Sequence, residues 1–546
     1  MAISRERLSL WIALSCGLGI AVFGARIFLL DGSYYMDEAS VVLSLDGLTA
    51  LETFSGELAG GGQNFPRFYL LLIRGVRALL GPETWATRLL PFLSFLAATF
   101  LWMRLLVVRF GARPELVLLG PVLLAMAPSW WLFGAVIKQY SFDTFVTLAL
   151  LSLPDRVFAE VLGSRRRLGR GLLLVVPVLF SYVYPVALTA RVTGWLAWKL
   201  RRGLRLDGVG TGVFLLGFAA AVGTLWFTDL QHTLGRPALV AMWSTCVLSQ
   251  NPQDFLEIVR RFVASWYLGP SEFVFHPKLS SPALFLAMGA LALGTVRVVG
   301  ALLSTAESEA DERWGSRSAA CLAGIVGVIA TSFLLDYPIC AGRLTLYALF
   351  FQQLLLLEGI DWLRSAAGGR RALQALVVLT IAFLLASGGW TATRVLRRVV
   401  AVAPIEDVRP LLERIPDEPT ETVIVTGCMA RQIRTLPEGL GSRQVVYLPF
   451  ENWQAELPEG REIWIVHSRL VPGLCESMRV KLAGLTDGFD RPEQPRGGAV
   501  VYHTRVLTRK ERREKRKLQL RAVGEQAKKE ARAERKKQRE RRLWGE

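Results

Sequence analysis

The chain is poor in the residues that build metal centres and disulfide frameworks. It has six cysteines and four histidines in 546 residues, and no two cysteines have CxxC spacing. This pattern indicates neither a zinc knuckle nor a small domain held together by disulfides. His276 has no partner at metal-ligand spacing, so a metal role for it is a weak alternative. Disulfides between Cys246 and Cys340, or between Cys428 and Cys475, stay open if these residues face an oxidising compartment.

Apolar runs dominate instead. Hydrophobic residues make up 52% of the chain and its mean hydropathy is +0.35, which is typical of a polytopic membrane protein. The first run, Leu8–Leu30, continues past signal-peptide length and predicts an uncleaved signal-anchor helix. About eleven spans of membrane-crossing length follow from the whole pattern. Residues 66–80 form a basic amphipathic segment, which predicts a helix at the membrane interface.

Basic loops predict the orientation of these spans. Arginines and lysines concentrate in the segments 165–170, 199–205 and 364–371, which we expect on the cytoplasmic side by the positive-inside rule. The exoplasmic segments are then 31–65, 229–281, 336–343 and all residues after Gly388.

The C-terminal part differs in kind. Short β-branched segments begin at Thr422, Gln444, Glu462 and Ala499, and turn or helical segments separate them. This alternation predicts a small α/β domain. The first strand lacks a following GxGxxG sequence, so no nucleotide site is indicated. We expect a transmembrane domain over residues 1–389 with an exoplasmic loop 31–65, a soluble exoplasmic domain over 390–505, and a tail over 506–546.

The tail carries much of the chain's positive charge. From Val506 onward there are 17 lysines and arginines and seven acidic residues, a net charge of +10 out of +18 for the whole chain. Such a segment is a solvated helix or disordered. Its charge favours anionic lipid headgroups or an acidic polymer, and no nucleic-acid partner is expected.

Three acidic residues lie where apolar segments begin or end. Asp37 and Glu38 follow the first span by a few residues and, on a helix, would point about 100° apart. Asp143 stands at the mouth of an apolar segment, on one helical face with Gln139 and Thr147. A carboxylate at this place costs free energy unless it faces a water-filled cavity or a polar partner. The alternatives are a hydrated pair at 37–38 and a helix-end acid at 143 that pairs with the neighbouring Lys138.

Four stretches in order resemble the GT-C superfamily of membrane glycosyltransferases, which use lipid-phosphate-linked sugars. The similarity is greatest to bacterial relatives of the dolichyl-phosphate-mannose–protein mannosyltransferases and of the lipid A aminoarabinose transferase. No single stretch is specific, and Arg67 and Lys138 replace a proline and an arginine of the family pattern. The four stretches are Met36–Ala39, Asn64–Pro91, Lys138–Asp143 and Glu406–Arg409.

The resemblance implies inverting transfer of a sugar from a polyprenyl phosphate to an exoplasmic hydroxyl or amine. Such a transfer needs one base for the acceptor proton, and cations to hold the phosphate that leaves. Asp37 is the expected base, and Glu38 the supporting carboxylate or a ligand to a divalent metal. Asp143 is the third expected catalytic residue. No cofactor is required beyond that optional metal.

Four cations are candidates for the donor phosphate: Arg343, Lys138, Arg67 and Arg88. Arg343 precedes a span on the expected exoplasmic side and suits bidentate phosphate binding. An interfacial anchor is the equal alternative for it.

The expected protein is thus an α-helical polytopic enzyme of a bacterial inner membrane, with lipid, polyprenyl-phosphate sugar and a protein, lipid or glycan acceptor as partners. The rival class is a transporter or flippase of a lipid-linked substrate, which should show inverted repeats of broken spans. A family member that binds without turnover is the third alternative.

Overall fold

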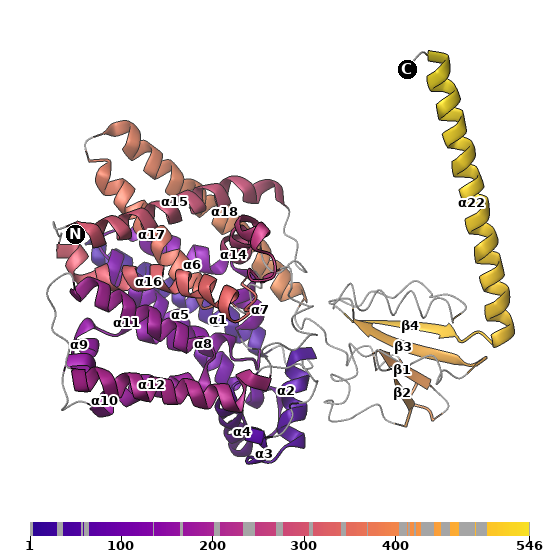
Figure 1. Ribbon diagram of the computed structural model, residues 1–546, viewed down its shortest axis with the longest axis horizontal. Helices are drawn as coiled ribbons and strands as arrows, with labels where there is room; N and C mark the ends of the chain where they lie inside the picture. The colour runs from indigo at the N-terminus through magenta and orange to yellow at the C-terminus, as the bar shows by residue number, and fades with distance from the viewer. Residues whose placement is uncertain are drawn as a thin grey trace. The chain divides into compact units, whose positions relative to one another are not determined.

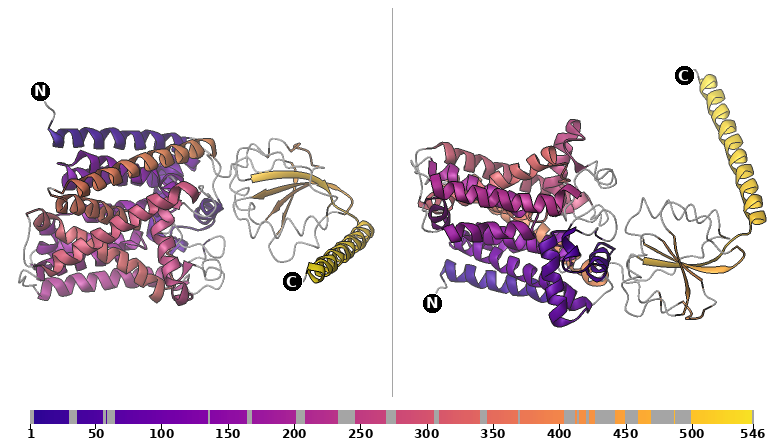
Figure 2. Two further views of the ribbon diagram at one scale, coloured as in Figure 1. Left: turned by 90° about the horizontal axis from the view of Figure 1, so that it is seen from above. Right: turned by 60° about the horizontal axis from the view of Figure 1, so that its bottom comes forward.

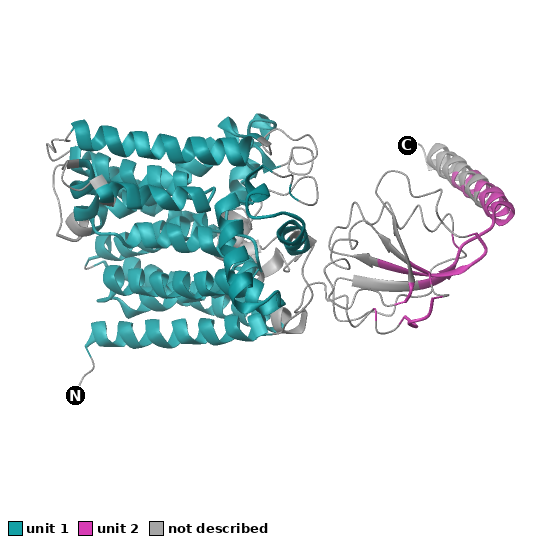
Figure 3. Cartoon of the chain, turned by 90° about the horizontal axis from the view of Figure 1, so that it is seen from below, with its two compact units in different colours: residues 1–32, 37–404 teal, residues 33–36, 405–546 magenta. Residues whose placement is uncertain are grey.

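A computed structural model of the 546-residue chain divides into two compact units, residues 1–32 with 37–404 and residues 33–36 with 405–546 (Figure 3). Each unit is considered by itself. The structure describes residues 4–29, 36–55, 58, 65–134, 136–163, 168–200, 208–232, 246–268, 277–304, 309–339, 345–368, 370–402, 412, 415–419, 422–426, 442–448, 459–468, 486 and 499–544.

The first unit is helical throughout the described part of the chain, and most of its long helices lie side by side with nearly parallel axes (Figures 1 and 2). Short 3₁₀ helices η2 (Val176–Phe180), η3 (Leu230–His232) and η5 (Pro252–Asp254) interrupt the α-helices. The α-helices are α1 (Arg5–Leu29), α2 (Met36–Gly47), α3 (Glu52–Ser55), α4 (Arg67–Leu80), α5 (Thr84–Phe110), α6 (Pro114–Ala125), α7 (Pro128–Phe133), α8 (Tyr140–Ser152), α9 (Asp155–Gly163), α10 (Leu168–Val175), α11 (Tyr184–Leu200), α12 (Gly208–Thr228), α14 (Phe255–Leu268), α15 (Pro277–Leu303), α16 (Glu309–Leu334), α17 (Ala348–Ala366) and α18 (Arg371–Val402).

Six of the described helices are long and apolar enough to cross a membrane: α1, α5, α12, and most of α15, α16 and α18. The segment expected to span near residues 142–153 forms α8, a buried helix of 13 residues. Helix α18 continues to Val402, beyond the expected domain boundary at 389. The polytopic class is therefore supported by six candidate spans, and the number eleven stays a prediction.

The backbones of α15 and α17 are in direct contact, because each helix places a glycine against the backbone of the other. A methyl group on Gly294 of α15 would lie 1.9 Å from the carbonyl oxygen of Leu355. One on Gly359 of α17 would lie 1.9 Å from the carbonyl oxygen of Ala290. Small residues allow this close approach between membrane helices, so neither position has room for any other residue.

The second unit contains a four-stranded sheet in the order β2-β1-β3-β4. Strand β1 pairs in parallel with β2 and β3, and β3 pairs antiparallel with β4. Ile465 and Val466 of β3 are both buried although successive strand residues point to opposite faces, so both faces of the sheet are covered here. The helices expected between the strands fall outside the described residues. The strands are β1 (Thr422–Thr426), β2 (Gln444–Leu448), β3 (Glu462–Ser468) and β4 (Ala499–Arg505).

The tail forms a helix, α22 (Arg509–Trp544), whose first turns are attached to the sheet (Figure 1). Thr508 caps it, since its backbone N–H and its hydroxyl donate to Glu511 Oε2 at 2.8 and 2.9 Å. Arg505 of β4 pairs with Glu511 at 2.9 Å, and Lys515 Nζ donates to the Thr486 carbonyl at 2.7 Å. Of the two forms expected for the tail, the structure shows the helix, and the first turns of this helix are attached to the rest of the second unit.

Two truncations should separate these parts of the tail. Deleting residues 518–546 should leave the sheet as resistant to protease as in the full chain, because the contacts described above end at Lys515. Deleting everything from Thr508 removes the cap and the ion pair with Arg505, and cleavage between residues 422 and 505 should become several times faster. Limited proteolysis followed by mass spectrometry measures both rates. Equal rates for the two truncations would show that the cap has no effect on the sheet.

Candidate functional site

The first three motif stretches, far apart in the sequence, meet around the side chain of Glu38. Glu38 lies on α2 and is 1% exposed. Its carboxylate accepts two hydrogen bonds from Arg88 of α5, from Nε at 2.9 Å and from Nη2 at 2.6 Å. It also accepts one from the backbone N–H of Ile137 at 3.0 Å, next to Lys138. Glu38 thus joins α2 to α5 and to the segment that leads into α8.

Arg67 at the start of α4 makes the second buried ion pair of this region. Its backbone N–H and its Nε donate to the two oxygens of Asp229 at 3.0 and 3.1 Å. Its Nη1 donates to the carbonyl of Thr53 at 2.8 Å. Asp229 directly follows α12, so the pair ties the motif segment to a helix 162 residues later in the chain. Asp229 was not among the expected site residues.

Asp143 is buried on α8 and hydrogen-bonds to a residue that the sequence analysis also missed. Ser181, between η2 and α11, donates its hydroxyl to Asp143 Oδ1 at 2.5 Å. Within the described part of the chain, no cation lies at ion-pair distance from this carboxylate. The alternative in which Asp143 pairs with Lys138 is therefore not observed.

Aromatic rings connect Lys138 and Asp143 to the Asn64–Pro91 stretch. Lys138 Nζ lies 5.6 Å from the ring centroid of Phe65, and Lys138 is 4% exposed. Tyr69 of α4 contacts Phe142 of α8, with ring centroids 5.0 Å apart. The Ser141 hydroxyl donates to the carbonyl of Pro91 at 2.9 Å. The three stretches thus form one packed region at one end of the helical unit.

The buried polar atoms that have no hydrogen-bond partner among the described residues include Tyr69 Oη and Gln139 Oε1 of this region. Tyr69 is fully buried and within electrostatic range of Asp143, and Gln139 is 6% exposed. Buried polar groups without partners are costly and uncommon. A hydroxyl donor and an amide acceptor beside Asp143 are suited to a polar ligand such as a sugar.

Burial changes the titration of Asp229. Loss of hydration raises its pKa from 3.8 to about 6, and the Arg67 guanidinium opposes this shift only in part. The Tyr182 hydroxyl lies in the same buried setting, and burial together with the Asp229 charge raises the pKa of Tyr182 well above its ordinary value. Tyr182 therefore keeps its proton at neutral pH, whereas Asp229 ionises near pH 6.

The Asp229 shift predicts a pH-dependent stability. The folded state holds this proton more tightly than the unfolded state, so the wild type should lose stability as pH rises from about 3.8 to 6. Two pKa units correspond to about 3 kcal/mol. Asp229→Asn cannot titrate, so its free energy of unfolding relative to wild type should rise by that amount across the same window. Thermal unfolding of both proteins at pH 4, 5, 6 and 7 measures the difference, and parallel curves would contradict the assignment.

Several predicted site residues lie outside this description. The Asp37 backbone is the second residue of α2, but its side chain is not described, and Arg343, His276 and the Glu406–Arg409 stretch fall outside the described residues. In the described part of the chain, no group of three or more His, Cys, Asp or Glu side chains could hold a metal ion. The metal role of Glu38 stays a hypothesis.

Sequence patterns carried a signal for some of what was missed. Asp229 is an acid at the end of an apolar run, the same pattern that drew attention to Asp143. Ser181 has no such signal, because one serine between two helices is indistinguishable from a cap or a turn residue. Arg67 and Arg88 were expected to bind phosphate, and in this structure each guanidinium is paired with a buried carboxylate.

No protein-family model matches the chain, and no curated protein matches it in sequence. Among solved structures, the chain is similar to ArnT from Cupriavidus metallidurans bound to undecaprenyl phosphate, with 15% identity and a TM-score of 0.43 over 90% of this chain and 98% of that chain. It is also similar to the apo state of that protein, with 15% identity and a TM-score of 0.30 over 90% and 97% of the two chains.

Proposed function

We propose that the chain is a GT-C-type membrane glycosyltransferase that moves a sugar from a polyprenyl phosphate to an exoplasmic acceptor, with inversion at the anomeric carbon. The observation that carries this proposal is the convergence of three motif stretches around Glu38, Lys138 and Asp143. These stretches are separated by up to about a hundred residues, so contacts between sequence neighbours do not bring them together. A scaffold that served only for packing would not need this concentration of charge in a buried place.

The proposed reaction forms a bond between the acceptor oxygen or nitrogen and the anomeric carbon, and breaks the bond from that carbon to the phosphate oxygen. The leaving phosphate keeps the electron pair, and Asp37 takes the acceptor proton. General-base assistance of this kind contributes a factor of about 10²–10⁴. Arg343 and Lys138 hold the phosphate charge that develops, which is the other requirement of the step.

Arg67, Arg88 and Glu38 take positioning roles in this proposal. Both arginines are neutralised by buried carboxylates, so their main effect is to fix α2, α4 and α5 relative to one another. A site acts on its substrate most effectively when its groups are held in place before the substrate arrives. Asp143, held by Ser181, then faces Tyr69 and Gln139 as the polar lining for the sugar.

The disulfide of Cys246 supports the exoplasmic side for this site. Cys246 is disulfide-bonded, and the Ile339 N–H donates to its carbonyl at 3.1 Å. Disulfides persist in oxidising compartments. Both residues follow helix ends on the Asp229 side of the unit, those of α12 and α16. This supports the proposal that the Asp229 side faces away from the cytoplasm. An integral protein of a bacterial inner membrane satisfies this arrangement.

Purified protein in lipid nanodiscs, supplied with a polyprenyl-phosphate sugar extract and candidate acceptors, tests the proposal. We expect mass spectrometry to detect release of polyprenyl phosphate together with a glycosylated acceptor. Arg343→Ala should weaken donor retention, and Arg343→Lys should recover part of it. Movement of intact donor between leaflets without sugar loss would instead establish the transporter class, and donor binding without either process would indicate a binding protein.

A further inference from the structure

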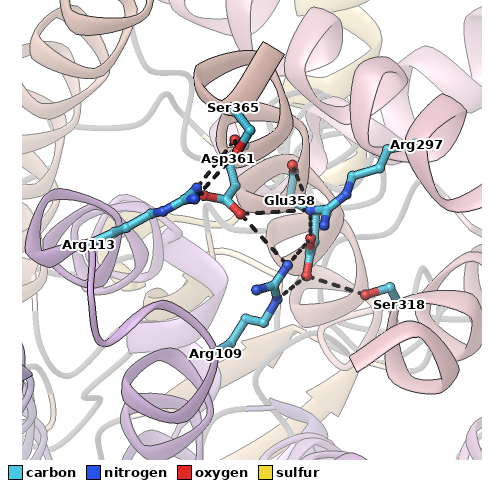
Figure 4. A network of polar contacts seen from close by, with 7 residues as sticks. All are labelled: Arg109, Arg113, Arg297, Ser318, Glu358, Asp361 and Ser365. Atoms are coloured by element: carbon cyan, nitrogen blue, oxygen red, sulfur yellow. Dashed lines mark hydrogen bonds and ion pairs between the residues drawn. The ribbon is translucent and has the colours of Figure 1, made fainter. Parts of the chain in front are cut away.

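The two units differ in how their basic residues are placed. In the helical unit, three largely buried arginines pair with two carboxylates of α17 (Figure 4). This network consists of Arg109, Arg113, Arg297, Glu358 and Asp361. In the second unit, α22 carries eleven lysines and arginines between residues 509 and 532, and all except Arg512 and Lys515 are exposed. The basic residues of α22 are therefore open to a partner from outside the chain.

Five of these exposed cations form a straight row along one side of α22. They are Lys510, Lys517, Arg521, Lys528 and Arg532, at successive spacings of 7, 4, 7 and 4 residues. An α-helix turns by about 100° per residue, so these side chains leave the helix axis within about 60° of one another. With a rise of 1.5 Å per residue, the row is about 33 Å long. We call it the basic stripe.

The rest of the second unit holds α22 by the opposite side. Arg509 Nε lies 3.5 Å from Glu459 Oε1, and Arg512 pairs with the same carboxylate. Lys515 Nζ donates to the Thr486 carbonyl at 2.7 Å. The mean direction of these three basic residues is about 170° away from that of the basic stripe. The stripe therefore faces away from these contacts, and a partner can approach it without detaching the helix.

The side of α22 that carries the stripe keeps a positive charge. Within about 60° of its centre lie two acidic residues, Glu514 and Glu525. Five positive and two negative charges leave a net charge of +3 on this side. A partner that matches it carries negative charge along a line of about 33 Å.

One exposed leucine lies on each flank of the stripe. Leu518 is 63% exposed and Leu520 is 65% exposed. Leu518 lies about 70° to one side of the stripe and Leu520 about 90° to the other. Long basic side chains reach phosphates while their methylene groups stay beside apolar surface. A bilayer interface offers both phosphates and apolar surface, whereas a soluble polyanion offers only charge.

We propose that the basic stripe of α22 lies on an anionic phospholipid surface. All five cations are in one straight row, so a flat layer of headgroups can contact them at the same time. Basic residues near such a surface are attracted to it additively. The helical unit tethers the second unit to a bilayer, so a weak attraction is enough for binding. This role is independent of the proposed sugar transfer.

Flotation of the full chain with lipid vesicles tests the proposal. The protein is held in phosphatidylcholine nanodiscs and mixed with vesicles of phosphatidylcholine alone or of phosphatidylcholine with phosphatidylglycerol. We expect binding only to the vesicles that contain phosphatidylglycerol. This binding should disappear in 1 M salt, because the Debye length falls from about 10 Å at 0.1 M to about 3 Å. Equal binding of the wild type to both kinds of vesicle would overturn the proposal.

A triple variant of the stripe measures its contribution. Lys517→Gln with Arg521→Gln and Lys528→Gln removes three of the five cations and should lower the partition coefficient onto the phosphatidylglycerol vesicles about a hundredfold. Glutamine is a good helix former, so α22 should persist. If this variant does not fold, deletion of residues 518–546 takes its place. That deletion also removes three stripe cations and should cause a loss of similar size, and wild-type binding would contradict the proposal.

A second triple variant is the charge-matched control. Arg513→Gln with Arg516→Gln and Lys529→Gln removes three exposed cations that lie about 70–130° away from the stripe. It should lower the partition coefficient less than tenfold. Equal losses in the two triple variants would show that total charge alone attracts the vesicles, and the stripe would have no role. Stripe-dependent binding of soluble polyglutamate without binding to vesicles would assign the stripe to an acidic polymer instead.

Discussion

Replacing Asp37 with asparagine should lower the rate of sugar transfer by a factor of about 10²–10⁴, the contribution of a positioned general base. The substitution removes the proton acceptor and changes the side-chain volume little. Asp37 is the second residue of α2, directly before the buried Glu38, so the contacts of Glu38 hold the backbone at this point. Donor binding should stay within a few-fold of wild type, since the carboxylate acts on the acceptor. Single-turnover transfer with pre-bound donor measures the chemical step.

Asp46→Asn provides the matched control on the same helix. Asp46 is 55% exposed and pairs with Arg77 at 2.8 Å, and neither residue is among the expected site residues. It should retain the wild-type rate. Full activity in Asp37→Asn would assign the base to another residue, of which Asp143 is the next candidate.

Breaking the Glu38–Arg88 pair should have the largest effect on stability. Glu38→Ala removes the carboxylate that pairs with the Arg88 guanidinium, which is 13% exposed, and it removes the acceptor of the Ile137 N–H. Removing one partner of a buried pair costs about 3–5 kcal/mol. Arg88→Ala should cost a similar amount, because it leaves Glu38 charged and buried. The rate at which the buried thiol of Cys321 reacts with a maleimide on heating reports the unfolding.

The double variant Glu38→Leu with Arg88→Met separates charge from packing. It removes both charges and fills a similar volume, so it should be more stable than either single alanine variant. Asp46→Ala removes a carboxylate that is 55% exposed, so it should cost less than Glu38→Ala, whose carboxylate is buried. If Glu38→Ala unfolds at the same temperature as Asp46→Ala, the pair does not hold α2 in place.

The sequence predicted the helical membrane class, the positions of the four strands and the stretches that converge. Runs of apolar residues and of β-branched residues are properties of neighbouring residues. They therefore predict helices and strands without knowledge of the tertiary structure. The partners of the charged residues could not be predicted. Arg67 and Arg88 carry the charge that phosphate binding needs, but their carboxylates lie 162 and 50 residues away. No local pattern indicates such distant pairs, and only the packing of α2, α4, α5 and α12 brings them together.

The tail shows the opposite case, where a local signal was present and overlooked. Thr508 and Glu511 have the spacing of a capping box, which predicts a helix start at this point. Its composition alone suggested a solvated helix or a disordered segment. The attachment of Lys515 to Thr486 depends on the fold of the second unit, so it could not be read from the sequence.

The glycine contact between α15 and α17 restricts how a lipid chain can reach the interior of the helical unit. Gly294 and Gly359 bring the two backbones so close that not even a methyl group fits between them. An isoprenoid tail is far wider than a methyl group and cannot pass through this seam. The two helices must also move as one body, because sliding either past the other would drive a side chain into a backbone. Lateral entry of the proposed polyprenyl donor is therefore confined to other helix pairs, and crosslinking α15 to α17 would leave that entry open.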